Sequence, residues 1–199
     1  MHSVGDGAII PTTTAAVRAA ERRRAMAALF DLHCDTLTRN LPSEGDTLDH
    51  PGLQLALGKV PAGTEWVQCF AIFVPDDQRG DDAVAFFDRY AAGFHRQAEK
   101  FGDRMAECRS FAEMERAVSE KKFAGLLTVE GGAALAGRLE RVQAVYDEGV
   151  RMMTLTWNGP NELASGHDTD SGFSAFGREA VGEMERLGIL VDVSHLNDR

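Results

Sequence analysis

The sequence predicts an α/β protein built on a parallel β-sheet. Apolar segments suited to strands alternate along the chain with segments that have the apolar spacing of helices, which is the order of repeated β/α units. Two strand segments, 123–130 and 189–194, are almost continuous apolar runs, as expected for strands that are covered on both faces. Polar side chains able to bind a metal follow the strand segments, and the carboxyl edge of a parallel sheet is where ligands bind.

The N-terminal residues 1–28 are predicted to be a partly helical extension outside the sheet. Residues 14–28 have a helix-forming composition that includes the run Arg22, Arg23 and Arg24. A short basic run of this kind is usually a solvated helix face. The sheet domain is therefore expected to span 29–199.

The elements of the sheet domain follow in order after the extension. The expected strands are 29–35, 65–74, 123–130, 150–157 and 189–194, and the expected helices are 81–102, 110–121, 137–148 and 173–187. Asp81 begins the first of these helices and Gly102 ends it. Ser110 and Glu113 form a capping-box pattern at the start of the second, and Gly188 ends the last. Polar, glycine-containing loops are expected at 36–63 and 158–172.

Composition and charge limit which classes of protein this chain can belong to. The chain has 199 residues, 44% of them hydrophobic, which is enough for the core of one domain or of part of a larger one. A formal net charge of −10 argues against a nucleic-acid partner, whose phosphates require a basic surface. No apolar run is long enough for a membrane anchor, and no secretory signal precedes the first strand. The three cysteines include no C-x-x-C pair, which favours reduced thiols in a cytoplasmic protein.

Three strand ends carry four side chains that could form one site. The first strand ends in His33 and Asp35, the third in Glu130, and the fifth is followed by His195. Alternate residues of a strand share a face, so His33 and Asp35 are expected to point the same way. Taken singly, the pair could hydrogen-bond a loop, and Glu130 or His195 could satisfy a neighbouring backbone group. Their common position at the carboxyl edge favours a metal site, because imidazole and carboxylate are ligands of Zn²⁺ and similar ions.

Several segments together resemble the membrane (renal-type) dipeptidase family of zinc peptidases. They are "DLHCDTL", "GLLTVEGG", "LERVQAVYDEGVRMMTLTWN" and "GFSAFGREAVGEMERLGILVDVSH", which lie in the same order within residues 29–195. The resemblance implies a metal-dependent hydrolase with a (β/α)₈ TIM-barrel fold. About the first five β/α units of that barrel would be present in 29–199.

The resemblance also implies an activity and a set of site residues. Dipeptides would be hydrolysed by a water shared between two zinc ions. His33 and Asp35 match ligands of one ion, Glu130 matches the carboxylate that bridges both ions and takes part in catalysis, and His195 matches a ligand of the second ion. Trp157 and Asn158 would contact the substrate, although mammalian members have a histidine at the position of Trp157.

Two departures from the family pattern leave alternatives open. His167, in the loop after Trp157, could replace the absent histidine, or could simply be solvated beside Asp168. The chain ends four residues after His195, before the family's further histidine ligand and catalytic aspartate, so we expect a fragment or a truncated product. Such a chain could hydrolyse dipeptides, act as another amidohydrolase on a lactam, lactone or N-acyl amino acid, or be an inactive metal-binding fragment. Its open sheet edges would also suit a homo-oligomer.

Overall fold

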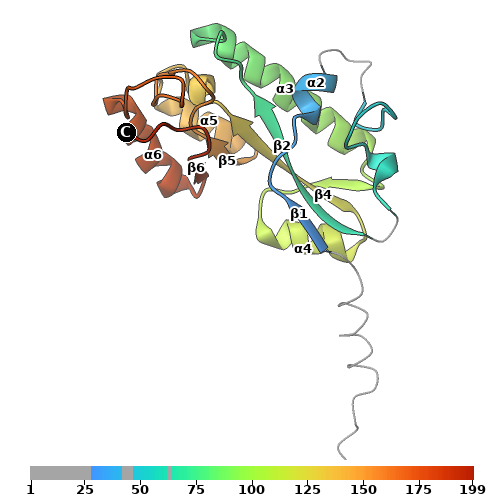
Figure 1. The fold of residues 1–199 in the computed structure, drawn as a ribbon. Coiled ribbons are helices and arrows are strands. Elements are labelled where there is room, and N and C mark those ends of the chain that lie inside the picture. Colours follow the sequence, from blue (N-terminus) through green and yellow to red (C-terminus); the bar gives the residue numbers. More distant parts are fainter. Residues whose placement is uncertain (1–27, 42–46, 62–63) are drawn as a thin grey trace, which may run out of the picture.

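All strands of the structure run parallel in a single curved sheet. The structure is a computed structural model that describes residues 28–41, 47–61 and 64–199. The strands are β1 (Ala28–Asp31), β2 (Glu65–Phe73), β3 (Met105–Glu107), β4 (Phe123–Glu130), β5 (Val150–Thr154) and β6 (Leu190–Asp192). Their order across the sheet is β1-β2-β4-β5-β6, and β3 pairs with the beginning of β4. The curved sheet is a half-barrel, which confirms the predicted α/β architecture as part of a TIM-barrel-like fold (Figure 1).

Helices connect the strands and cover them. They are α2 (Thr36–Asn40), α3 (Gly80–Lys100), α4 (Phe111–Ser119), α5 (Glu140–Asp147) and α6 (Ala175–Leu187), with short 3₁₀ turns η1 (Leu57–Lys59) and η2 (Gly132–Leu135). Figure 1 shows α3 running along the sheet, with α5 and α6 grouped near β5 and β6. Ser110 caps α4 by accepting a hydrogen bond from Glu113 N, as the capping-box pattern predicts.

The main core lies between the sheet and its helices. Phe87 and Phe94 of α3 are fully buried against Phe70 and Ile72 of β2 and Leu127 of β4. A smaller cluster on the other face of the sheet joins Cys69, Leu126 and Ala117 of α4. Both faces of the central strands are therefore covered, which explains why every residue of β4 is buried.

Several sequence-based boundaries need correction. The predicted strands 150–157 and 189–194 are longer than the observed β5 and β6. The sheet has six strands rather than five, because β3 is a three-residue strand with no periodic signal of its own. Residues 36–40 form α2 rather than a loop, and five residues are too few to display a helical period. The first strand ends at Asp31, although Cys34 still exchanges backbone hydrogen bonds with Cys69 and Ala71 of β2. The predicted helix over 14–28 lies almost wholly outside the described residues.

Candidate metal centre

The carboxyl ends of β1 and β4 bring three metal-capable side chains together. His33 Nε2 lies 3.2 Å from Asp35 Oδ1 and 3.4 Å from Glu130 Oε2. One ligand atom from each residue can be chosen so that all three lie within 4.8 Å of one another. The arrangement follows from the register of the parallel strands. Glu130, the last residue of β4, pairs with Phe73 at the end of β2. Because β1 pairs with the other edge of β2, the segment after β1 lies near this end of the sheet as well.

His195 reaches the same carboxylate from the other side. Its Nε2 lies 3.1 Å from Glu130 Oε1, so each oxygen of Glu130 faces a different imidazole. His195 has a φ of 70°, a conformation that a non-glycine residue adopts only where its surroundings hold it. The turn is held by Asp192, whose Oδ1 accepts hydrogen bonds from both Ser194 N and Ser194 Oγ.

Asp192 belongs to this cluster, and sequence reasoning missed it. Its second oxygen, Oδ2, accepts a hydrogen bond of 2.6 Å from Thr154 Oγ1 on β5. Burial by itself would raise the pKa of Asp192, but the hydrogen bonds from Thr154 and Ser194 outweigh that effect and hold the pKa below its usual value. The sequence feature that could have identified Asp192 is its place inside the otherwise apolar run "ILVDV".

Glu130 is the most buried ionisable group of the cluster, with 7% of its surface exposed. Burial raises the pKa of its carboxyl, the nearby charges of Asp35 and Asp192 raise it further, and His33 and His195 oppose the change. The buried Glu130 carboxylate lies close to two other carboxylates, and added positive charge would favour its ionised form. A divalent cation would supply that charge, and the mixed imidazole and carboxylate donors suit one. The residues present therefore fit a metal.

The backbone after Glu130 turns at two glycines. Gly131 has a φ of 99°, and a Cβ on it would lie 2.8 Å from the carbonyl oxygen of Val74. Val74 N in turn donates a 2.8 Å hydrogen bond to Glu130 O. Only glycine allows this close approach, so the "EGG" sequence holds the Glu130 carboxylate at the sheet edge.

A cavity of about 490 Å³ opens beside the cluster. Its lining residues are His33, Asp35, Thr38, Arg39, Phe73, Pro75, Phe86, Tyr90, Glu130, Trp157 and His195. Trp157 packs edge-on against Phe73, with ring centroids 5.0 Å apart. Asn158 is not among the lining residues, and its carbonyl accepts a hydrogen bond from Asp168 N. The roles of Trp157 and Asn158 toward a substrate therefore stay predictions.

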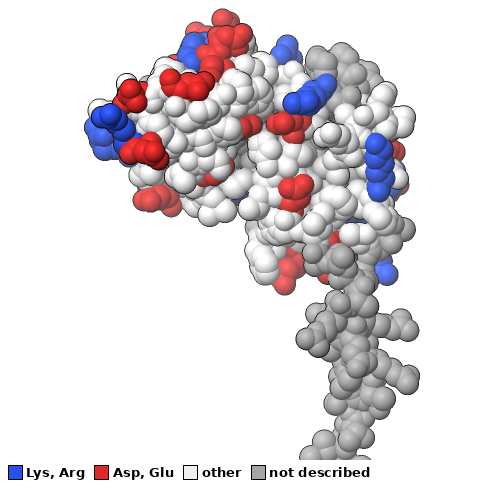
Figure 2. Space-filling model, viewed as in Figure 1, with Lys and Arg blue, Asp and Glu red and all other residues white. Residues whose placement is uncertain are grey.

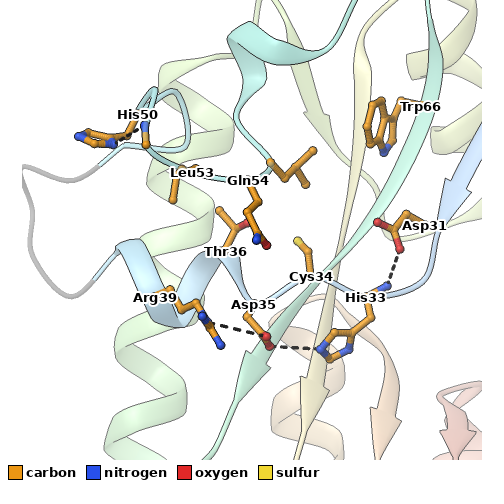
Figure 3. A pocket seen from close by; sticks show the side chains of 12 residues that line it. Asp31, His33, Cys34, Asp35, Thr36, Arg39, His50, Leu53, Gln54 and Trp66 are labelled. Carbon is orange, nitrogen blue, oxygen red and sulfur yellow. Dashed lines mark hydrogen bonds and ion pairs between the residues drawn. The ribbon is translucent and has the colours of Figure 1, made fainter.

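A larger cavity of about 980 Å³ lies on the other side of His33, Asp35 and Arg39. Figure 3 shows these three side chains joined in a row, with Cys34 pointing away from His33 and Asp35. Burial raises the pKa of the Cys34 thiol to about 11, and the direction of its side chain separates it from the His33 and Asp35 side chains. His167 stacks on His195 at a centroid distance of 6.1 Å and pairs with Asp168, which leaves both interpretations of His167 open.

The family is settled by comparison with known proteins. The family described as "Membrane dipeptidase (Peptidase family M19)" matches residues 17–199. The chain belongs to the M19 membrane dipeptidase family. Membership in a metallopeptidase family implies a metal cofactor, and the three-residue cluster is a candidate place for it.

Solved structures share the fold of this M19 chain. A metallopeptidase from Rhodobacter sphaeroides, liganded with a phosphinate mimic of the dipeptide L-Ala-D-Ala, is 25% identical with a TM-score of 0.74 over 87% of this chain and 60% of that one. An M19 dipeptidase described as dipeptidase AC is 24% identical, with a TM-score of 0.74 over 87% and 58%. A probable dipeptidase, PvdM of Pseudomonas aeruginosa, is 20% identical, with a TM-score of 0.73 over 92% and 50%. The chain thus spans about half the length of these structures.

The surface and helices add two observations. In the view of Figure 2, basic side chains stand as separate groups among acidic ones rather than as one basic surface. No helix in the described part of the chain is long and apolar enough to cross a membrane.

Proposed function

We propose that the site of this M19 chain hydrolyses dipeptides with the help of two zinc ions. The observation that carries the proposal is the position of Glu130, whose two oxygens each face a different imidazole. A bridging carboxylate requires that geometry. Family membership and the dipeptide mimic bound by the Rhodobacter sphaeroides relative favour a dipeptide as substrate over a lactam, lactone or N-acyl amino acid.

His33, Asp35 and Glu130 would hold the first ion, and Glu130 with His195 would contribute to holding the second. Bound zinc would lower the pKa of water and polarise the peptide carbonyl. Glu130, buried between the two imidazoles, would be the carboxylate that holds the metal beside both of them. Asp192 and Thr154 hold the turn that carries His195, so they act by positioning it.

The cavity beside the cluster would hold the substrate. Its volume of about 490 Å³ lies in the range of small-molecule pockets, and its lining combines four aromatic residues with six polar or charged ones. Trp157 and Phe73 form the wall nearest the strand ends. Trp157 would therefore contact the substrate through its ring rather than through a histidine nitrogen.

The test is metal-dependent hydrolysis. The chain is stripped of metal with a chelator, returned to buffer with or without Zn²⁺, and incubated with Ala-Ala while released alanine is quantified. Because the chain spans about half the length of its solved relatives, we expect slow release at most from this chain alone, and that release should require added Zn²⁺ and be lost in Glu130→Gln. Release that persists without metal, or is undiminished in Glu130→Gln, would contradict the proposal.

A further inference from the structure

Asn197 follows the candidate metal ligand His195 by two residues and does not itself belong to the metal cluster. Its side-chain Nδ2 donates hydrogen bonds to two backbone carbonyls, Thr169 O at 2.7 Å and Ser171 O at 2.6 Å. Its Oδ1 accepts a hydrogen bond of 3.2 Å from Arg199 N. Both ends of the amide are therefore engaged, which holds this side chain in one orientation.

The two carbonyls belong to the segment 165–171, which lies against the turn that carries His195. His167 N donates a hydrogen bond of 3.0 Å to His195 O, and Asn197 N donates one of 3.3 Å to Ser165 O. The imidazoles of His167 and His195 also stack, with ring centroids 6.1 Å apart. The turn thus meets the segment through its backbone, and the side chain of Asn197 adds two further hydrogen bonds to the same contact.

On its other side, the segment 165–171 is fixed to the residues that follow β5. Gly166 N donates to Gly159 O, and Asp168 N donates to Asn158 O, both at 3.0 Å. A Cβ on Gly166 would collide with the carbonyl oxygen of Trp157, so the two stretches of backbone are in close contact. Whatever is bonded to this segment is therefore held in place relative to the end of β5.

His195 needs such an anchor because of its backbone conformation. Its φ of 70° is one that a non-glycine residue keeps only where its surroundings hold it. The hydrogen bonds of Asp192 act on Ser194, which comes before His195, whereas those of Asn197 act after it. The backbone is thus fixed on both sides of the imidazole that lies 3.1 Å from Glu130.

We propose that Asn197 is a positioning residue for His195. By fastening the turn to the segment 165–171, it keeps the His195 imidazole beside Glu130 and strengthens metal binding at His195 more than at His33. This assignment rests on the proposed function and deepens it, because it makes the affinity for the second ion depend on the anchored segment. Such coupling is reciprocal, so an ion bound at His195 would in turn hold the segment in place.

The test compares Asn197→Asp with the unaltered chain. The two side chains have the same shape, but a carboxylate has no N–H to donate to Thr169 O and Ser171 O. Its added negative charge would by itself strengthen cation binding, so weaker zinc binding would point to the lost hydrogen bonds rather than to charge. Asn197→Gln keeps both donors and should restore part of the loss. Asp198→Asn is the matched control, because Asp198 is an exposed neighbour whose side chain makes no hydrogen bond or ion pair within the described part of the chain.

Two readouts are followed by NMR of the isotope-labelled chain. The first is hydrogen exchange of the His167 amide without metal, which reports its bond to His195 O. We expect this exchange to be about tenfold faster or more in Asn197→Asp and unchanged in Asp198→Asn. The second is a Zn²⁺ titration that monitors the imidazole resonances of His195 and His33. Half-saturation at His195 should require about tenfold more zinc in Asn197→Asp, while that at His33 should stay within about twofold.

The outcomes separate the positioning role from the proposed function. Unchanged exchange of the His167 amide in Asn197→Asp, or an equal loss of zinc affinity at His33 and His195, would overturn the role of Asn197. If the His195 resonances of the unaltered chain do not respond to zinc while Asn197→Asp still speeds exchange at His167, the proposed second ion is contradicted and the positioning of His195 by Asn197 is supported.

Discussion

Replacing Glu130 by glutamine should remove most of the stabilisation that a bound metal gives to the folded chain. The two side chains have the same shape, so the substitution leaves the packing of this 7%-exposed residue unchanged. It removes the negative charge that faces both His33 and His195. An amide oxygen is a much weaker ligand for Zn²⁺ than a carboxylate, and we expect the affinity to fall by about 100-fold or more.

The expected size of the effect follows from ligand linkage. At a Zn²⁺ concentration about 100 times the dissociation constant, binding stabilises the folded state by about 2.7 kcal/mol. For a chain of this length that raises the melting temperature by about 5–11 °C. After a 100-fold loss of affinity the same concentration gives only about 0.4 kcal/mol, or about 1–2 °C.

The assay is thermal unfolding followed by circular dichroism, with and without Zn²⁺. Glu107→Gln is the matched control, because Glu107 is also a partly buried carboxylate that contacts a histidine, His95, but lies away from the metal cluster. The control should melt at a lower temperature in buffer yet keep the full Zn²⁺-induced rise. An unchanged rise in Glu130→Gln would refute the bridging role.

Three further predictions concern the stability of the fold. His95 of α3 pairs with Glu107 at 2.8 Å and with Glu148 at 3.1 Å. The hydrogen bond with Glu107 raises the pKa of His95, although burial of the imidazole opposes that rise. Burial would raise the pKa of Glu107, but its hydrogen bonds with His95 and Arg109 outweigh burial and lower that pKa. The pairing therefore stabilises the fold most between the unfolded pKa values of Glu and His, about 4.3 and 6.5, and is lost as pH rises through the raised pKa of His95 or falls through the lowered pKa of Glu107. His95→Gln should lower the free energy of unfolding in urea by about 1–2 kcal/mol at pH 6 and by clearly less at pH 9; an equal loss at both pH values would contradict the ion pairing. Ser174→Ala should lower that free energy by about 1 kcal/mol, because Ser174 Oγ caps α6 through a 2.8 Å bond from Gly177 N, and an unchanged urea midpoint would argue against the cap. Gly177→Ala should lower the free energy of unfolding by about 2 kcal/mol or more, because the added Cβ would meet the backbone carbonyl of Leu163. Gly182→Ala in the same helix places its Cβ in open space and should raise that free energy, so equal effects of the two substitutions would contradict this packing.

The edge of the sheet that carries the candidate site was predictable from the sequence, because apolar runs mark strands and the residues that end or follow parallel strands share one edge of the sheet. That reasoning placed His33, Asp35, Glu130 and His195 at the carboxyl edge, where the structure has them close together. Their role as metal ligands stays a prediction.

The elements that sequence reasoning missed are short or depend on tertiary contacts. β3 and α2 contain three and five residues, too few for a period to be read. The position of Arg39 beside the cavity depends on α2, and that of Tyr90 on how α3 packs, so neither follows from local sequence. Asp192 could have been predicted from the sequence, because a charged residue inside an apolar strand needs a polar partner, which in the structure is Thr154.

The central claim is that His33, Asp35 and Glu130 hold a divalent metal ion. The most direct measurement is an anomalous difference map collected at the zinc absorption edge from crystals of the chain grown with Zn²⁺. The account predicts a peak about 2.0–2.2 Å from His33 Nε2, from an Asp35 oxygen and from a Glu130 oxygen. A map in which zinc is found elsewhere on the chain, with these three side chains free of any peak, would contradict it.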